Sequence, residues 1–143
     1  MAILEDDGAL RELLERCRTI AVLGIKSGQA DDAYRVPLYL QRAGYHILPI
    51  NPKLDRLLNH VVVDRIAALD VAPDLVNVFR DPRHLPGHVD EILALDPLPR
   101  GVWLQLGIRD DASATRLSAA GIDVVQDRCL MVEHARLLGG AAR

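Results

Sequence analysis

The chain has 143 residues, of which 50% are hydrophobic and 26% charged, so its length and composition predict one globular domain over residues 1–143. These values exclude a disordered tail protein, a collagen-like fibre and a small disulfide scaffold. The net charge of −3 lacks the excess of Lys and Arg that nucleic-acid-binding proteins usually carry, so nucleic acid is not an expected partner.

Two further features indicate a cytoplasmic protein. Cys17 and Cys129 stand far apart and have neither the C-x-x-C nor the zinc-site spacing, which suits a reducing compartment. The first residues do not have the pattern of a signal peptide, and no apolar run approaches the roughly 20 residues that cross a bilayer. We therefore expect a cytoplasmic location and no membrane partner.

Two kinds of segment alternate along the chain. Short apolar runs rich in branched residues have the pattern of buried parallel strands. Longer segments with apolar residues three and four positions apart have the pattern of amphipathic helices. In chain order the sequence predicts a helix over 7–16, a strand over 19–24, a helix over 32–43, a strand over 45–50, a short helical turn over 64–69 within an otherwise unclear stretch 54–69, a strand over 74–79, a helix over 88–95, a strand over 101–106, a helix over 110–120, a strand over 123–125 and a helix over 129–138.

This alternation predicts the fold class. Strands separated by helices form parallel sheets, and right-handed crossovers place the helices on both faces. We therefore expect an α/β fold with a single doubly wound, Rossmann-like, five-stranded and mainly parallel sheet. Ligands of such sheets bind outside the carboxyl ends of the strands, so functional side chains are expected at that edge.

A cation follows each predicted strand. The residues are Lys26, Lys53, Arg80, Arg109 and Arg128, and the two lysines are the only ones in the chain. Because parallel strands end at the same edge, the sequence predicts a positive rim there, suited to an anionic ligand. Loops are polar in general and other arginines fall elsewhere, so the pattern indicates the class of ligand and not its identity.

The first two strand ends narrow the class of ligand. Gly24 and Gly28 follow the first strand without matching the G-x-G-x-x-G or G-x-x-x-x-G-K-[ST] motifs. Binders of NAD usually carry an acid at the end of the second strand, where it holds the ribose. Here that place is Asn51, Pro52 and Lys53, and the lysine favours an additional phosphate. These residues indicate NADP or coenzyme A in preference to NAD.

Six short segments resemble one known family. The chain is similar to the small stand-alone coenzyme A-binding proteins, whose domain is like the Rossmann-like coenzyme A-binding domain of succinyl-coenzyme A synthetase alpha subunits. The similarity runs in order from about residue 10 to residue 138. The segments are residues 20–24, 44–45, 48–52, 76–80, 103–107 and 127–129 with Glu133 and His134.

The resemblance implies a coenzyme A site and its residues. The first turn would cradle the phosphates, the Pro52-Lys53 corner would meet the nucleotide, and Phe79 with Arg80 would flank the adenosine. The chain departs from the family where many relatives have a serine two places after the first glycine, because Lys26 stands there and Ser27 follows. The expected site residues are Gly24, Ile25, Lys26, Ser27, Asn51, Pro52, Lys53, Phe79, Arg80, Gly107 and Cys129.

The sequence supports catalytic and metal-binding groups less well than it supports a coenzyme A site. His84 and His88 are four residues apart, but Pro86 and Gly87 between them are expected to spoil the first turn of a helix. Cys129, Glu133 and His134 resemble a nucleophilic pair with an acid, although most such cysteines are inert packing residues. We expect Trp103 to lie in the core or in an interface, and Tyr34 and Tyr39 to be packing residues of the helix over 32–43.

We therefore predict a protein that binds coenzyme A or a short acyl-coenzyme A and is not an enzyme. The alternatives are an NADP-binding oxidoreductase subunit and a nucleotide-regulated interaction module. The sequence leaves two further options open, a homo-oligomer and an unidentified protein partner. A further expectation is that Cys129 opens the last helix at the ligand edge and forms a mixed disulfide with the thiol of bound coenzyme A under oxidising conditions.

Overall fold

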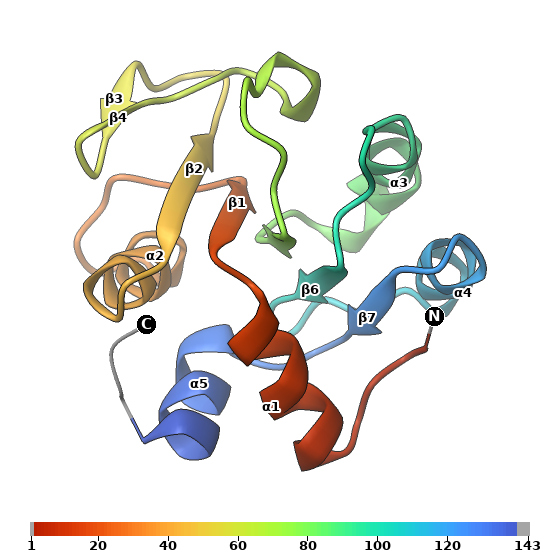
Figure 1. The fold of residues 1–143 in the computed structure, drawn as a ribbon. Coiled ribbons are helices and arrows are strands. Elements are labelled where there is room, and N and C mark those ends of the chain that lie inside the picture. The colour runs from red at the N-terminus through yellow and green to blue at the C-terminus, as the bar shows by residue number, and fades with distance from the viewer. Residues whose placement is uncertain (1, 140–143) are drawn as a thin grey trace.

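The computed structural model describes residues 2–139. Within this range five strands form one parallel sheet in the order β2-β1-β5-β6-β7 (Figure 1). This arrangement confirms the predicted α/β, Rossmann-like fold class. The strands are β1 (Thr19–Leu23), β2 (His46–Ile50), β5 (Leu75–Val78), β6 (Gly101–Leu104) and β7 (Asp123–Val125).

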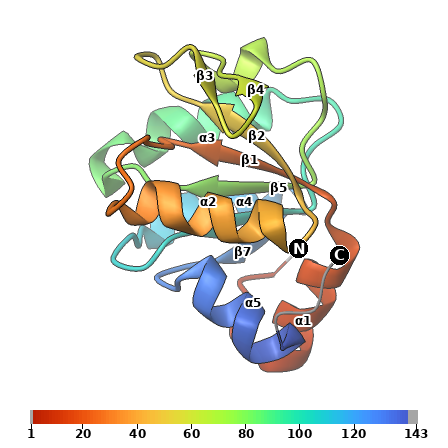
Figure 2. The same cartoon turned by 90° about the vertical axis from the view of Figure 1, so that its left-hand side faces the viewer.

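Helices cover both faces of the sheet (Figures 1 and 2). On one face, Ile20 and Val22 of β1 pack in a core with α1 (Asp7–Arg16), α2 (Asp32–Arg42) and α5 (Leu130–Leu138). On the other face, Ala21 and Leu23 pack with α3 (Leu85–Leu93) and α4 (Asp111–Ala119). Successive residues of a strand point to opposite faces, so these continuous apolar runs are needed to fill both cores.

The strand order creates one position where the connections diverge. From β1 the chain crosses to β2 on one side, and it then returns past β1 to β5 on the other side. The carboxyl ends of β1 and β5 therefore lie next to each other at a topological switch point, with Leu23 paired to Val78. Ligands of doubly wound sheets bind in the crevice at such a point.

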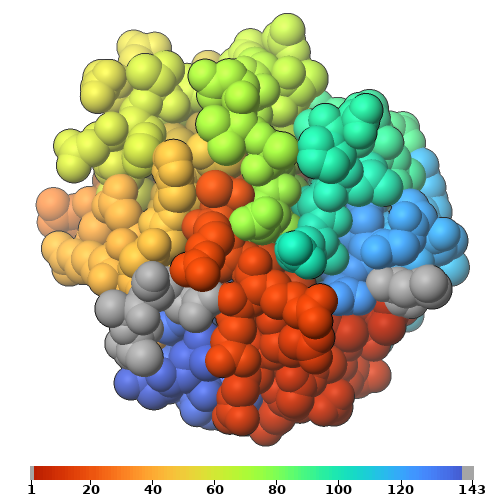
Figure 3. Space-filling model, viewed as in Figure 1, coloured from red at the N-terminus to blue at the C-terminus, as the bar shows by residue number. Residues whose placement is uncertain are grey.

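The segment between β2 and β5 contains a hairpin that the sequence pattern did not predict. β3 (Arg56–Leu57) and β4 (His60–Val61) are antiparallel, and Leu58 and Asn59 make the two-residue turn with φ of 52° and 66°. Each strand has only two residues, too few to show an alternating pattern. The hairpin and the short helix η1 (Ile66–Ala68) form the upper part of the face in Figure 3.

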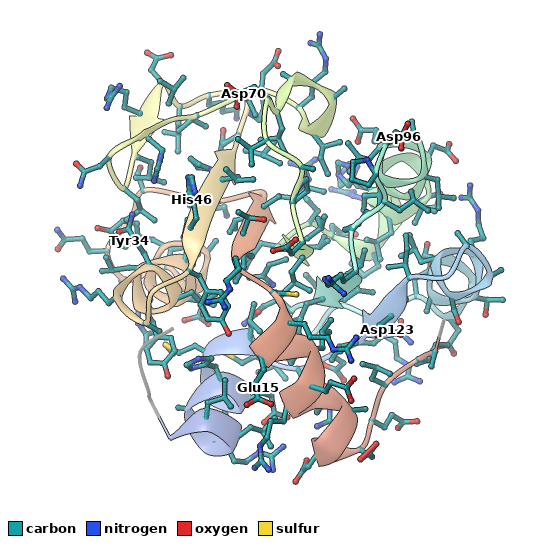
Figure 4. All side chains as sticks on the ribbon, in the orientation of Figure 1. Glu15, Tyr34, His46, Asp70, Asp96 and Asp123 are labelled. Atoms are coloured by element: carbon teal, nitrogen blue, oxygen red, sulfur yellow. The ribbon has the colours of Figure 1, made fainter. Side chains whose placement is uncertain are left out.

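Two histidines connect this hairpin to the sheet. His46, labelled beside β2 in Figure 4, stacks on His60 with 4.9 Å between ring centroids. Burial lowers the pKa of His60, and the neighbouring His46 and Arg56 add to the shift. The hairpin therefore packs best when the His60 ring is neutral.

One predicted helix boundary is wrong for an identifiable reason. α3 begins at Leu85, directly after the short helix η2 (Pro82–His84), whereas the sequence predicted a start at His88. Pro86 does not spoil the helix, because it lies in the first turn, where a backbone N–H has no partner within the helix. His84 and His88 consequently face the same side, with 6.5 Å between their rings.

The other predicted elements agree with the observed ones to within two residues at each end. One contact lies outside the predictions altogether, because Ile3 pairs with Val124 and extends the sheet beside β7. Trp103 is fully buried in the core, as predicted, and its Nε1 donates a hydrogen bond to the Arg128 carbonyl at 2.8 Å. Over the described residues, no helix is long and apolar enough to cross a membrane.

Candidate functional site

A cleft of about 430 Å³ lies at the carboxyl ends of β1, β2 and β5. This is the edge that the sequence predicted, at the switch point of the sheet. We call it the main cleft. Its lining includes seven of the predicted site residues: Gly24, Lys26, Asn51, Pro52, Lys53, Phe79 and Arg80.

Gly24 shapes the floor of the main cleft. Its φ of +88° is a conformation that side chains disfavour. A Cβ atom at this position would also lie 3.0 Å from Cδ of Arg80 and 3.2 Å from the Phe79 carbonyl oxygen. Only glycine lets the turn after β1 approach the backbone after β5 this closely.

Asn51 connects two of the loops that border the cleft. Its Nδ2 donates to the Ile25 carbonyl at 2.6 Å, and its Oδ1 accepts from the Lys53 backbone N–H at 2.7 Å. The amide therefore ties the loop after β1 to the turn after β2. A carboxylate in this place would have no N–H group for the Ile25 carbonyl.

The cations around the edge differ in their partners. Lys26 Nζ lies 3.7 Å from Asp31, Arg109 pairs with Asp111 at 3.3 Å, and Arg128 pairs with Glu133 at 2.8 Å. The side chains of Lys53 and Arg80 have no ion pair or hydrogen bond among residues 2–139, and the Nε of Arg80 is shielded from solvent. Two positive charges in the main cleft are thus available for an anion.

A second cavity of about 190 Å³ borders the main cleft. Lys26 and Phe79 line both spaces. Cys129 lines only the second, with the buried Gln105, the exposed Leu106 and the first residues of α2. We call this space the thiol cavity. The two cavities are therefore neighbours along this edge, with Lys53 in the lining of one and Cys129 in the lining of the other.

Some predicted residues lie elsewhere. Ile25 is fully buried and contributes its carbonyl to Asn51. Ser27 and Gly107 are exposed and line neither the main cleft nor the thiol cavity. Arg109 and Arg128 border a different hollow, next to the N-terminal residues, so only Lys26, Lys53 and Arg80 of the five strand-end cations line the main cleft. The guanidinium groups of Arg109 and Arg128 are taken up by acids on α4 and α5.

The sequence patterns did not predict the far wall of the main cleft. It consists of polar side chains from η2, α3 and the loop after β4. α3 begins beyond the same strand end as Arg80. This position at the carboxyl edge of the sheet was the feature of the sequence from which part of the wall could have been predicted. The loop after β4 gave no signal, because its segment had no clear pattern. The residues are Asp64, Arg65, Asp81, His84, His88 and Glu91.

Cys129 and His134 do not share an environment. Cys129 is the N-cap residue of α5 and lies half-buried in the thiol cavity. His134 is fully buried, and its Nδ1 forms a 2.9 Å hydrogen bond with the hydroxyl of Tyr39. Burial raises the pKa of Tyr39, so its hydroxyl stays protonated and can donate. His134 therefore belongs to the packing between α2 and α5.

A family model and a curated relative both match most of the chain. A family model described as a CoA binding domain matches residues 18–135. A protein of Bacillus subtilis (strain 168), YneT, is 35% identical over 127 residues, which are 88% of this chain and 92% of that protein.

Solved structures show the same fold. A Thermus thermophilus structure, cell-free ID.343, superposes with a TM-score of 0.88 at 44% identity, covering 93% of this chain and 99% of the other. A protein of Pyrococcus horikoshii OT3 superposes with a TM-score of 0.88 at 29% identity, covering 94% of each chain.

Proposed function

The chain belongs to the CoA binding domain family, and from this premise we propose that it binds coenzyme A, free or with a short acyl group, at the carboxyl edge of its sheet. The observation that carries the proposal is the pair of available cations, Lys53 and Arg80, in the main cleft. A nucleotide with several phosphates is a ligand that such a pair recognises.

The sizes and the linings of the two cavities support one orientation of the bound ligand. Coenzyme A has a phosphorylated adenosine at one end, a pyrophosphate in the middle and a narrow pantetheine arm that ends in a thiol. The main cleft is the larger and holds the available cations, so we assign it to the nucleotide. Lys26 borders both cavities and would meet the pyrophosphate, and the arm would follow the thiol cavity toward Cys129.

We propose a binding role without catalysis. The groups that border the thiol cavity include Cys129, but His134 is buried against Tyr39 and supplies no base there. The proposed location is the cytoplasm, a compartment in which cysteines stay reduced. Cys17 and Cys129 form no disulfide among the described residues, which suits this location.

Isothermal titration calorimetry with coenzyme A, NADP and NAD tests the proposal. Coenzyme A is expected to bind with the highest affinity, because it alone has an arm that fills the thiol cavity. NAD is expected to bind most weakly, because it lacks the additional phosphate. Tighter binding of NADP would favour the oxidoreductase alternative, and an absence of binding by coenzyme A would refute the proposal.

A further inference from the structure

Each charged side chain that lines the main cleft can be checked for a partner. Each of its acids has a partner: Asp64 lies 3.3 Å from Arg65, Asp81 lies 3.8 Å from Arg83, and Glu91 lies 2.8 Å from His88. Lys26 is paired with Asp31. Among the described residues that line the cleft, this leaves Lys53 and Arg80 as the cations without a side-chain partner.

Two cations without side-chain partners suit a phosphate monoester, which carries close to two negative charges at neutral pH. Coenzyme A has one such group, on the 3′-hydroxyl of its ribose, and dephospho-coenzyme A lacks it. The pyrophosphate also carries two charges, but they are spread over two phosphorus atoms, and Lys26 and the first turn are assigned to it. The monoester is therefore the group that the main cleft can distinguish.

His88 adds a third group to this wall. Its Nδ1 lies 2.8 Å from Oε1 of Glu91, three residues further along α3, and its side chain is only 18% exposed. A carboxylate only accepts hydrogen bonds, so Nδ1 must donate, and Nε2 is the uncommitted nitrogen of the ring. In residues 2–139, Nε2 has no hydrogen-bond partner, although it is shielded from solvent.

We propose that His88, held in place by Glu91, is a binding residue for the 3′-phosphate of coenzyme A. A phosphate next to an imidazole favours the protonated ring, whose Nε2–H then donates to a phosphate oxygen. Glu91 acts as a positioning residue, because it fixes which nitrogen is free. With Lys53 and Arg80, the cleft then selects a nucleotide that carries a phosphate monoester. This inference rests on the proposed function and specifies its ligand.

Calorimetric titration of each variant with coenzyme A and with dephospho-coenzyme A tests the inference. A hydrogen bond to a charged group is worth about 1.5–3 kcal/mol, so His88→Ala is expected to weaken coenzyme A binding about 10-fold or more. Its affinity for dephospho-coenzyme A should change less than about 2-fold. Glu91→Gln should reduce the preference for coenzyme A in the same direction by a smaller factor, and melting curves establish that each variant is folded.

His46→Ala is the matched control, because His46 is an exposed histidine that lines neither the main cleft nor the thiol cavity. It should leave the preference for coenzyme A unchanged. The inference is overturned if His88→Ala weakens both ligands equally, as a contact with the adenine base would, or if it alters neither. If the unmodified protein binds neither ligand, the proposed function fails instead, so the two failures are distinguishable.

Discussion

Lys53 can be changed without disturbing the turn that carries it. Its side chain is exposed and has no ion pair in the described part of the chain, and only its backbone N–H is used, by Asn51. Lys53→Glu replaces an attraction for phosphate with a repulsion. We expect coenzyme A to bind about 10-fold more weakly or worse in calorimetry, with the fold retained.

The effect of Lys53→Glu should decrease as salt is added, because an exposed charge is screened. Arg109→Glu provides the matched control, since Arg109 is also an exposed cation at a strand end but does not line the main cleft. That variant should bind coenzyme A normally. Equal losses in both variants would mean that only the overall charge matters, and the main cleft would lose its assigned role.

Cys129 tests the direction of the ligand. If the arm of coenzyme A follows the thiol cavity, the oxidant diamide should join the ligand thiol and Sγ of Cys129 in a disulfide. Diamide takes up the two hydrogens and is reduced to the hydrazine. Intact mass spectrometry should show one coenzyme A adduct, lost in Cys129→Ser and kept in Cys17→Ser, because Cys17 is fully buried. An adduct that survives in Cys129→Ser would contradict this direction.

At the scale of elements, the turn after β1 depends on close approach and not on backbone conformation alone. Gly24 and Gly107 have nearly the same φ, +88° and +87°, but an added Cβ would meet Arg80 and Phe79 only at Gly24. Gly107→Ala should lower the free energy of unfolding by about 1–2 kcal/mol. In urea denaturation Gly24→Ala should lose more, and it should also weaken coenzyme A binding by displacing Arg80.

Equal losses of stability for Gly24→Ala and Gly107→Ala would show that the side chain of Arg80 gives way without cost. In that case the contact between the β1 turn and the β5 end would not explain why glycine occupies position 24.

α1 and α5 are joined by an ion network that makes stability depend on pH. Arg136 contacts Asp7 through two hydrogen bonds and Glu133 through a third, all 2.8 Å long. These hydrogen bonds lower the pKa of Asp7 and of Glu133, and nearby Arg128 adds to both shifts. A lowered carboxyl pKa stabilises the fold above the ordinary carboxyl range, and this contribution is lost as the pH falls through the lowered values.

Arg136→Gln should therefore lower the urea midpoint at pH 7, and the difference from the unmodified protein should shrink near pH 3. Arg16→Gln is the control, because Arg16 pairs with Glu12 on the exposed surface of α1. Such exposed pairs contribute little, so its midpoint should stay unchanged. A pH-independent difference for Arg136→Gln would indicate lost packing of the side chain and not lost ion pairs.

At the scale of the whole molecule, a ligand that binds the folded chain must raise its stability. Coenzyme A at 100 times its dissociation constant adds about 2.7 kcal/mol. For a domain of this size the melting temperature should rise by roughly 5–10 °C in a thermal denaturation scan. ADP should have a smaller effect and NAD little effect. A larger shift with NADP than with coenzyme A would support the oxidoreductase alternative.

Local patterns in the sequence were sufficient for the elements of the main sheet and most of their helices. The apolar spacing of α1 and the short run of β7 predicted their observed limits, Asp7–Arg16 and Asp123–Val125. The edge of the sheet that holds the main cleft also followed, because parallel strands must end on the same side. The seven predicted residues that line the cleft follow the ends of β1, β2 and β5, the strands nearest the switch point.

Contacts between distant parts of the chain were decided only by the tertiary structure. Five strand-end cations looked equivalent in the sequence, but α4 and α5 place acids beside Arg109 and Arg128, and none beside Lys53 and Arg80. His88 joins the cleft because α3 starts three residues earlier than predicted. Periodicity reports which face of an element is buried, whereas the availability of a charge depends on which side chains the fold brings against it.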